Sequence, residues 1–132
     1  MRLKIFRRDL PLRHVMTVFR GTISRIRTLQ VELEQDGLKG YGEAYEDLHW
    51  GISLEDMVAT LEKCREETSK HALADPHAFY QKIKPFVADN AAAATALEMA
   101  ACDLWGKVRN VPLWKVWRYN TKNLPISSYT LG

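Results

Sequence analysis

The chain lacks the features that mark a membrane, secreted or disulfide-rich protein. No apolar run approaches the roughly 20 residues that a helix needs to cross a bilayer. Charges spread through residues 1–20 argue against a signal peptide. The two cysteines, Cys64 and Cys102, are too few and too scattered for a disulfide framework or a zinc site. The 132 residues have an ordinary globular composition. We therefore expect a cytoplasmic protein with one main hydrophobic core and no membrane partner.

Self-contained catalytic machinery is also missing from the sequence. There is no glycine-rich phosphate loop, no HExxH motif and no CxxC motif. The four histidines are not spaced as a set of metal ligands. Glu98 and Asp103 would lie about 140° apart around a helix, so they could not act as a pair. Asp103 and Lys107 have the spacing of a structural ion pair. We predict no catalytic residue and no metal ligand in this chain.

Basic residues are concentrated at the start of the chain. Residues 1–30 hold eight arginines and lysines and a single acid, Asp9. Such a segment can attract phosphate or carboxylate groups, although a solvated strand face explains it more simply. Nucleic-acid binding would require a stacking platform or a docking motif, and neither is recognisable. We therefore predict no nucleic-acid partner.

The first third of the chain predicts strands. Residues 2–7 read as a short strand that ends before Pro11, because proline cannot donate a ladder hydrogen bond. Residues 13–22 show no clean period and are predicted to form a loop. Residues 25–34 alternate between apolar and polar side chains, as a strand with one buried face does.

The dipeptide Asp36-Gly37 predicts a tight type I′ hairpin turn. A two-residue turn sets the register, so that Leu33 faces Gly40 and Val31 faces Gly42. Large apolar side chains therefore lie opposite positions without a side chain. This pattern predicts that a helix packs unusually closely on that face of the sheet.

Helices are predicted over the rest of the chain. Ser53 and Asp75 are suitable N-caps for helices to about residue 70 and over 76–84, and Pro85 should end the second. A third helix over 91–109, capped by Asp89 or Asn90, is apolar nearly all round. Such a helix needs burial on every side, which suggests that another domain covers one of its faces.

A single helical turn over 113–118, a polar linker over 119–124 and a strand over 125–131 complete the predicted elements. The predicted fold class is α+β, with a three-stranded antiparallel sheet packed on a helical bundle. The final strand would then be the first strand of a further, missing (β/α) barrel.

Three segments resemble the enolase superfamily, in its mandelate racemase/muconate lactonizing enzyme group and dipeptide epimerase branch. Residues 11–46 carry a PL start, a GT pair, a DG turn and GYGEA. Residues 95–117 (TALEMAACDLWGKVRNVPLWKVW) resemble the family's helix, with Glu98 in place of an aspartate and Asn110 in place of a glycine. Residues 126–132 (ISSYTLG) resemble the first barrel strand of dipeptide epimerases.

The resemblance implies a capping domain over residues 1–120, followed by a linker and first barrel strand over 121–132. The absent barrel would supply the Mg²⁺ ligands and lysines that remove a proton next to a carboxylate, so the chain alone should be inactive. The parent would be an isomerase, with dipeptide epimerase as the leading activity. Muconate cycloisomerase, N-acyl amino acid racemase and o-succinylbenzoate synthase remain alternatives. So does a non-catalytic interaction module, and a homo-oligomer is left open.

The resemblance also implies that two loops, His14–Thr22 and Tyr45–Gly51, recognise a small-molecule substrate together with the barrel. Met16 and Phe19 would form an apolar wall, while Arg20 would pair with a substrate carboxylate unless the family's arginine aligns with Gly21. Trp50 and His49 would frame a side-chain pocket, although Trp50 could equally serve in packing. The implied substrate-facing residues are Met16, Phe19, Arg20, Thr22, His49, Trp50 and Thr130.

Overall fold

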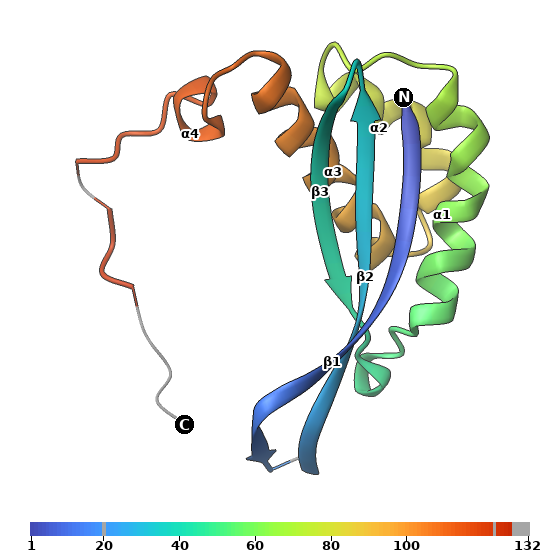
Figure 1. Ribbon diagram of the computed structural model, residues 1–132, viewed down its shortest axis with the longest axis vertical. Helices are drawn as coiled ribbons and strands as arrows, with labels where there is room; N and C mark the ends of the chain where they lie inside the picture. The colour runs from blue at the N-terminus through green and yellow to red at the C-terminus, as the bar shows by residue number, and fades with distance from the viewer. Residues whose placement is uncertain (20, 123, 128–132) are drawn as a thin grey trace.

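A computed structural model describes residues 1–19, 21–122 and 124–127, and within them the fold is α+β, as predicted (Figure 1). The strands are β1 (Arg2–Val18), β2 (Gly21–Gln35) and β3 (Leu38–Tyr45). They form an antiparallel sheet in the order β1-β2-β3. The predictions that concern Arg20 and Thr130 fall outside the described residues.

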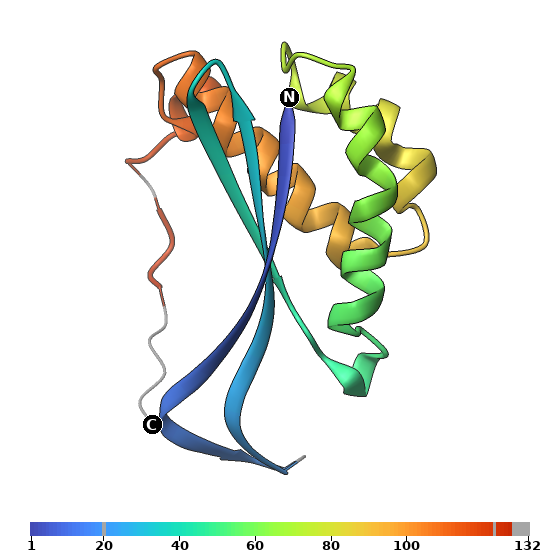
Figure 2. The same ribbon diagram turned by 45° about the vertical axis from the view of Figure 1, so that its right-hand side comes forward.

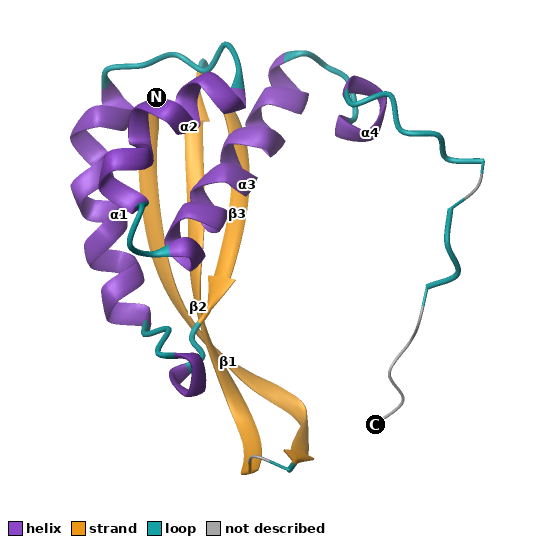
Figure 3. Ribbon diagram, turned by 180° about the vertical axis from the view of Figure 1, so that it is seen from behind, coloured by secondary structure: helices purple, strands orange, loops and turns teal. Residues whose placement is uncertain are grey.

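The helices are η1 (Leu48–Trp50), α1 (Leu54–Ser69), α2 (Pro76–Val87), α3 (Ala91–Val108) and α4 (Leu113–Val116). The three longest, α1, α2 and α3, lie on one side of the sheet. α1 and α3 pack against one sheet face and α2 packs against both of these helices, whereas no described helix covers the opposite face (Figures 1 and 3). The predicted caps are confirmed, because Ser53, Asp75 and Asn90 each accept a backbone N–H from the first turn of their helix.

The predicted hairpin register is confirmed, with Leu33 opposite Gly40 and Val31 opposite Gly42. Positive φ angles of 52° at Asp36 and 82° at Gly37 fit the type I′ turn. The core-facing side chains of β2 are fully buried on the face that packs against α1 and α3. They are Leu29, Val31 and Leu33.

The close approach of α3 to β3 depends on two glycines. A Cβ atom added at Gly40 would collide with the carbonyl oxygen of Ala100, and one added at Gly42 would collide with that of Ala96. The predicted close packing is therefore confirmed. It also explains the alanine-rich composition of the buried side of α3, since small side chains let the helix lie against the strand.

The prediction of a loop over residues 13–22 is wrong. β1 continues through Pro11 to Val18 and pairs with β2, which begins at Gly21, after a register shift between Pro11 and Met16. The shift interrupts the alternation that would reveal a strand. β1 is an edge strand, so alternate residues direct their backbone groups away from β2. Leu3 is one of these residues, because its carbonyl faces Arg65, and Pro11, eight residues further along, is another. The missing N–H of Pro11 therefore removes no ladder hydrogen bond.

The predicted end of the second helix is also wrong, because α2 passes Pro85 and ends at Val87. Ile83 and Val87 are both fully buried. Their burial outweighs the hydrogen bond that Pro85 cannot make. In the last predicted strand, the described residues 125–127 adopt no strand, and the rest of it lies outside the described residues.

Beyond the helical layer, β1 and β2 project as a two-stranded ribbon (Figure 2). We call residues 9–19 and 21–26 the arm. Five large apolar side chains are exposed along it: Leu10, Val15, Met16, Val18 and Phe19. A two-stranded ribbon in water is only marginally stable. The arm therefore has the composition of a segment that is covered when it functions.

Candidate functional site

The arm carries three of the predicted substrate-facing residues. Phe19 follows the last paired residue, Val18, at the tip and is 91% exposed, while Met16 is 45% exposed. Thr22 is also exposed, and its Oγ1 lies 3.2 Å from that of Thr17 across the ribbon. The tip thus presents apolar surface beside a small hydroxyl pair.

The second predicted loop is a compact closed segment, which we call the clip (residues 47–52). Asp47 and Ile52 close its neck with two backbone hydrogen bonds, each 2.9 Å long. The clip contains η1, which ends at its C-cap Gly51, and the φ of 70° at Gly51 permits the tight return of the chain to Ile52. The clip is therefore a preformed element rather than an open loop.

His49 and Trp50 lie side by side on the clip. Their rings meet edge to face with 5.3 Å between centroids. The carboxylate of Asp47 accepts the backbone N–H of His49 at 3.1 Å and so holds the start of η1. Trp50 is 68% exposed. Its broad accessible surface suits contact with a ligand or a covering domain better than packing within this chain.

The arm and the clip belong to the same end of the molecule. The clip lies below α1, beside the base of the arm, and the arm extends further from the body (Figures 1 and 2). The structure brings His49 and Trp50 into contact, whereas Met16 and Phe19 lie further out along the ribbon. The predicted residues that the structure describes thus divide between the compact clip and the projecting arm.

A charged junction connects the arm and the clip. Arg27 on β2 binds Glu46 at 2.9 Å and Glu55 in the first turn of α1 at 2.5 Å. The hydrogen bond from Arg27 is the main cause that lowers the pKa of Glu55. The carboxylate of Glu46 also accepts the N–H of Leu54, the first residue of α1, at 3.1 Å. The sequence predictions did not identify this junction.

A signal for the junction was present in the sequence. Arg27 continues the alternate, core-facing positions of Val31 and Leu29, where an apolar residue would be expected. The hairpin register also places Glu46 opposite Arg27. An arginine at the end of a row of apolar side chains, opposite a carboxylate on the neighbouring strand, indicates an ion pair at the edge of the core.

Other basic residues of the N-terminal third also have partners within the chain. Arg25 binds Asp9 at 2.9 Å, and this hydrogen bond lowers the pKa of the Asp9 carboxyl. Arg8 donates to the side chain of Gln30 and lies over the ring of Phe6. These contacts support the prediction of a charged strand face.

Neither a metal centre nor a membrane span is found among the described residues. No group of three or more histidines, cysteines, aspartates or glutamates is placed to hold a metal ion there. In the same residues, no helix is long and apolar enough to cross a bilayer. The predicted ion pair between Asp103 and Lys107 is confirmed at 2.7 Å.

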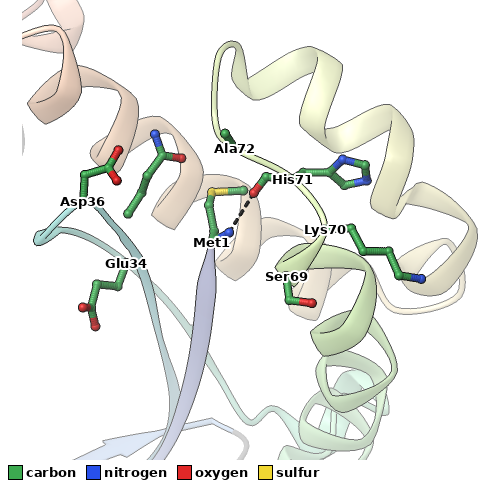
Figure 4. A pocket seen from close by; sticks show the side chains of 8 residues that line it. Met1, Glu34, Asp36, Ser69, Lys70, His71 and Ala72 are labelled. Carbon is green, nitrogen blue, oxygen red and sulfur yellow. Dashed lines mark hydrogen bonds between the residues drawn. The ribbon is translucent and has the colours of Figure 1, made fainter.

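A polar pocket (Figure 4) is lined by Met1 at the N-terminal end of β1, which is the opposite end of the sheet from the arm (Figure 1). Glu34, Asp36 and His71 are among its lining residues, and the amino group of Met1 donates to the carbonyl of His71 at 2.7 Å. None of the predicted substrate-facing residues lines this pocket. It therefore plays no part in the candidate site.

A three-stranded sheet covered by helices on one face, with a projecting arm and a compact clip at one end, is the architecture of a capping domain. The chain belongs to the mandelate racemase/muconate lactonizing enzyme family, because the model of that family's N-terminal domain matches residues 1–117. The recognition made from the sequence motifs is confirmed.

Curated relatives match the chain along most or all of its length. The L-Ala-D/L-amino acid epimerase of Flavobacterium johnsoniae is 32% identical over 132 residues, covering all of this chain and 39% of that protein. The L-Ala-D/L-Glu epimerase of Bacteroides thetaiotaomicron is 34% identical over 136 residues, covering all of this chain and 34% of that protein. The N-succinylamino acid racemase of Thermus thermophilus is 31% identical over 113 residues, covering 82% of this chain and 30% of that protein. The chain thus spans less than two-fifths of each relative.

Solved structures confirm the fold. The dipeptide epimerase from Cytophaga hutchinsonii, complexed with Mg and the dipeptide D-Ala-L-Val, superposes with a TM-score of 0.82. The match covers 92% of this chain and 33% of that one, at 15% identity. At such low identity the likeness establishes the arrangement of the elements and nothing about the substrate.

Proposed function

We propose that this chain is the substrate-specificity cap of a Mg²⁺-dependent dipeptide epimerase. Residues 1–120 would form the capping domain, and residues 121–132 the linker and first strand of a (β/α) barrel. The observation that carries the proposal is that all of this chain matches two relatives named as epimerases of L-Ala dipeptides. The cytoplasmic location predicted from the sequence belongs to the same proposal.

The cap would exclude water and position the distal part of the substrate while the barrel does the chemistry. Met16 and Phe19 would provide an apolar wall from the arm, with Thr22 beside them. His49 and Trp50 would frame the pocket that receives a substrate side chain. Arg20 and Thr130 are proposed to face the substrate as well, with Arg20 binding a carboxylate.

Magnesium belongs to the barrel in this proposal. The described residues offer no cluster of ligands that fits a divalent cation, so no step of the reaction is assigned to a metal held by this chain. When held by a barrel, the ion would stabilise the negative charge that forms as the proton leaves. The part played by this chain is recognition and closure.

A second candidate is the cap of an N-acyl amino acid racemase. It is favoured by the 31% identity to the N-succinylamino acid racemase of Thermus thermophilus. The two candidates differ in the distal group, which is an amino-terminal residue in a dipeptide and an acyl chain in the racemase substrate. The cap therefore has to discriminate a charged amine from a neutral or acidic acyl group.

The experiment is a domain exchange. The matching N-terminal part of the Flavobacterium johnsoniae relative is replaced by this chain, and α-hydrogen exchange in D₂O is measured with L-Ala dipeptides and N-succinyl amino acids. The proposal predicts exchange on dipeptides. A folded, Mg²⁺-loaded chimera that exchanges only N-succinyl amino acids would favour the second candidate, and one that exchanges neither would contradict both.

The proposal that a barrel follows this chain can be tested in the DNA sequence. A reading frame that continues beyond the codon for Gly132 into barrel-type strands with spaced acidic ends would support it. A stop codon at that point would favour a separate interaction module.

A further inference from the structure

We propose that Arg27 and Glu46 are a positioning pair that fixes the clip, and with it His49 and Trp50, relative to the base of the arm. The relevance to substrate recognition rests on the proposed function. The mechanical coupling of clip and arm does not, because it follows from contacts within this chain.

A backbone hydrogen bond places Arg27 and Glu46 opposite each other. Glu46 comes directly after β3, and its N–H donates to the carbonyl of Arg27 at 2.9 Å. This bond continues the β2–β3 register by one residue beyond the assigned strand. Both side chains consequently leave the sheet on the side of the helical layer, at the point where that layer ends and the arm begins.

The carboxylate of Glu46 joins three segments. Nη1 of Arg27 lies 2.9 Å from one carboxylate oxygen and 3.2 Å from the other. The first oxygen also accepts the N–H of Leu54 at 3.1 Å. That N–H is one of the donors that a helix start cannot satisfy by itself, and a carboxylate is favourable at this end of a helix. The side chain of Glu46 is only 11% exposed, whereas that of Arg27 is 42% exposed, so the carboxylate is better shielded from water than the guanidinium that binds it.

Arg27 has a second anchor on α1. Its Nη2 binds the carboxylate of Glu55 at 2.5 Å, and this hydrogen bond is the main cause that raises the pKa of Arg27. One guanidinium on β2 therefore binds both Glu46, which directly precedes the clip, and Glu55 on α1, the helix that follows the clip. A planar group with several fixed donors suits such a double contact better than a lysine does.

The clip moves as one piece, and the pair determines where that piece lies. The bridge between Asp47 and Ile52 closes the neck of the clip independently of Arg27. Glu46 precedes this bridge and Leu54 follows it, so their contact closes a second, outer ring. Loss of Arg27 or Glu46 should leave the clip folded but free to swing relative to the arm.

The test uses the full chain with the substitutions Glu46→Gln, Arg27→Met and both together. The matched control is Glu66→Gln, which removes a 2.9 Å ion pair with Lys70 at the far end of α1. The readouts are the indole N–H resonance of Trp50 and amide hydrogen exchange in the clip and the core. The amide of Leu54 reports the contact with Glu46, the amide of Ile52 reports the closed neck of the clip, and the amide of Val31 reports the core.

Each single substitution should raise exchange at Leu54 about tenfold, which is typical for loss of a charge-assisted hydrogen bond, and should leave exchange at Ile52 unchanged because the bridge to Asp47 stays closed. The double substitution should add little to either single one, since the two residues act through one contact. The Trp50 resonance should shift in these variants and stay in place in the control. Arg27→Lys retains the charge but binds two carboxylates less well, so it should raise exchange less than Arg27→Met does.

Three results would overturn the inference. They are unchanged exchange at Leu54, an equal rise at Val31, which would mean a purely global contribution to stability, and fully additive effects. In the epimerising chimera, the same variants should raise KM more than they lower kcat. A loosened clip without dipeptide turnover would contradict the proposed function alone, and turnover with an unaffected clip would contradict this inference alone.

Discussion

The carboxylate of Asp103 on α3 accepts the backbone N–H of Tyr41 on β3 at 2.8 Å. Lys107, one turn further along α3, donates to the carbonyl of Lys39 at 2.7 Å and also binds Asp103. β3 is an edge strand, and its outward-facing backbone groups would otherwise be open to strand addition. The helix that packs on the sheet thus also protects its edge.

Substitution of Asp103 should expose this edge. Asp103→Ala should raise hydrogen exchange at the Tyr41 amide and lower the free energy of unfolding by about 1 kcal/mol, the usual cost of one such hydrogen bond. Glu98→Ala, an exposed position on the same helix, is the control and should change neither. Native-state exchange and urea unfolding measure both effects. Equal behaviour of the two variants would refute the protective role.

Replacement of Gly42 by alanine should be far more damaging than an ordinary glycine substitution. The new methyl group would overlap the carbonyl oxygen of Ala96, so α3 would have to move off the strand. We expect the free energy of unfolding to fall by about 3 kcal/mol, as for severe overpacking. Gly106→Ala is the control, because its nearest neighbours lie at 3.2 Å or more. Urea denaturation of both variants tests the difference.

The open face of the sheet should make stability dependent on acid pH. Glu32 is nearly buried beneath Lys4 at 2.9 Å and Lys39 at 3.3 Å. The hydrogen bond from Lys4 is the main cause that lowers the pKa of Glu32. The folded state therefore binds this proton less readily than the unfolded chain does. Its contribution is complete above the ordinary carboxyl pKa and is lost as the pH falls through the lowered one.

Glu32→Gln should therefore be less stable than the wild type at pH 7, with the difference shrinking toward about pH 3. Urea unfolding at a series of pH values measures this. Glu66→Gln serves as a control for the loss of an exposed ion pair. Parallel pH profiles for Glu32→Gln and the wild type would contradict the assignment.

The two cysteines should differ in reactivity. Cys64 is fully buried on α1, and burial raises the pKa of its thiol to about 11, whereas Cys102 on α3 is only partly buried. Because the thiolate is the reacting species, a thiol reagent should label Cys102 first in the native state. Cys64 should react only as the protein unfolds. Peptide mass spectrometry of partly labelled protein tests the order, and equal native rates would contradict it.

Much of the body of the fold was predictable because local chemistry left few alternatives. The Asp36-Gly37 turn permits one tight hairpin register, which brings two glycines under α3. The first backbone N–H groups of a helix have no acceptor within the helix. Ser53 and Asp75 supply side-chain acceptors for them, so these residues mark the helix starts. Such features depend on neighbours in sequence and can be recognised without coordinates.

The remaining features depend on contacts between distant segments. The register shift after Pro11 removes the alternation that identifies a strand, so the arm resembled a loop. The helix continues past Pro85 because tertiary burial compensates for the lost bond. The contact between Arg27 and Glu46 was not predicted, because it appears only when the hairpin register is extended by one residue beyond β3. Substrate contact by Phe19 and Trp50 remains a prediction from family resemblance.

Under the proposed function, this chain shapes and closes a site, and the barrel removes the proton from carbon. The most direct test is deuterium uptake at the α-carbons of L-Ala-L-Glu in D₂O with Mg²⁺, measured for the purified chain and for the chimera that supplies a barrel. We predict uptake with the chimera and none above background with the chain alone. Catalytic turnover by the rigorously purified chain would contradict the claim.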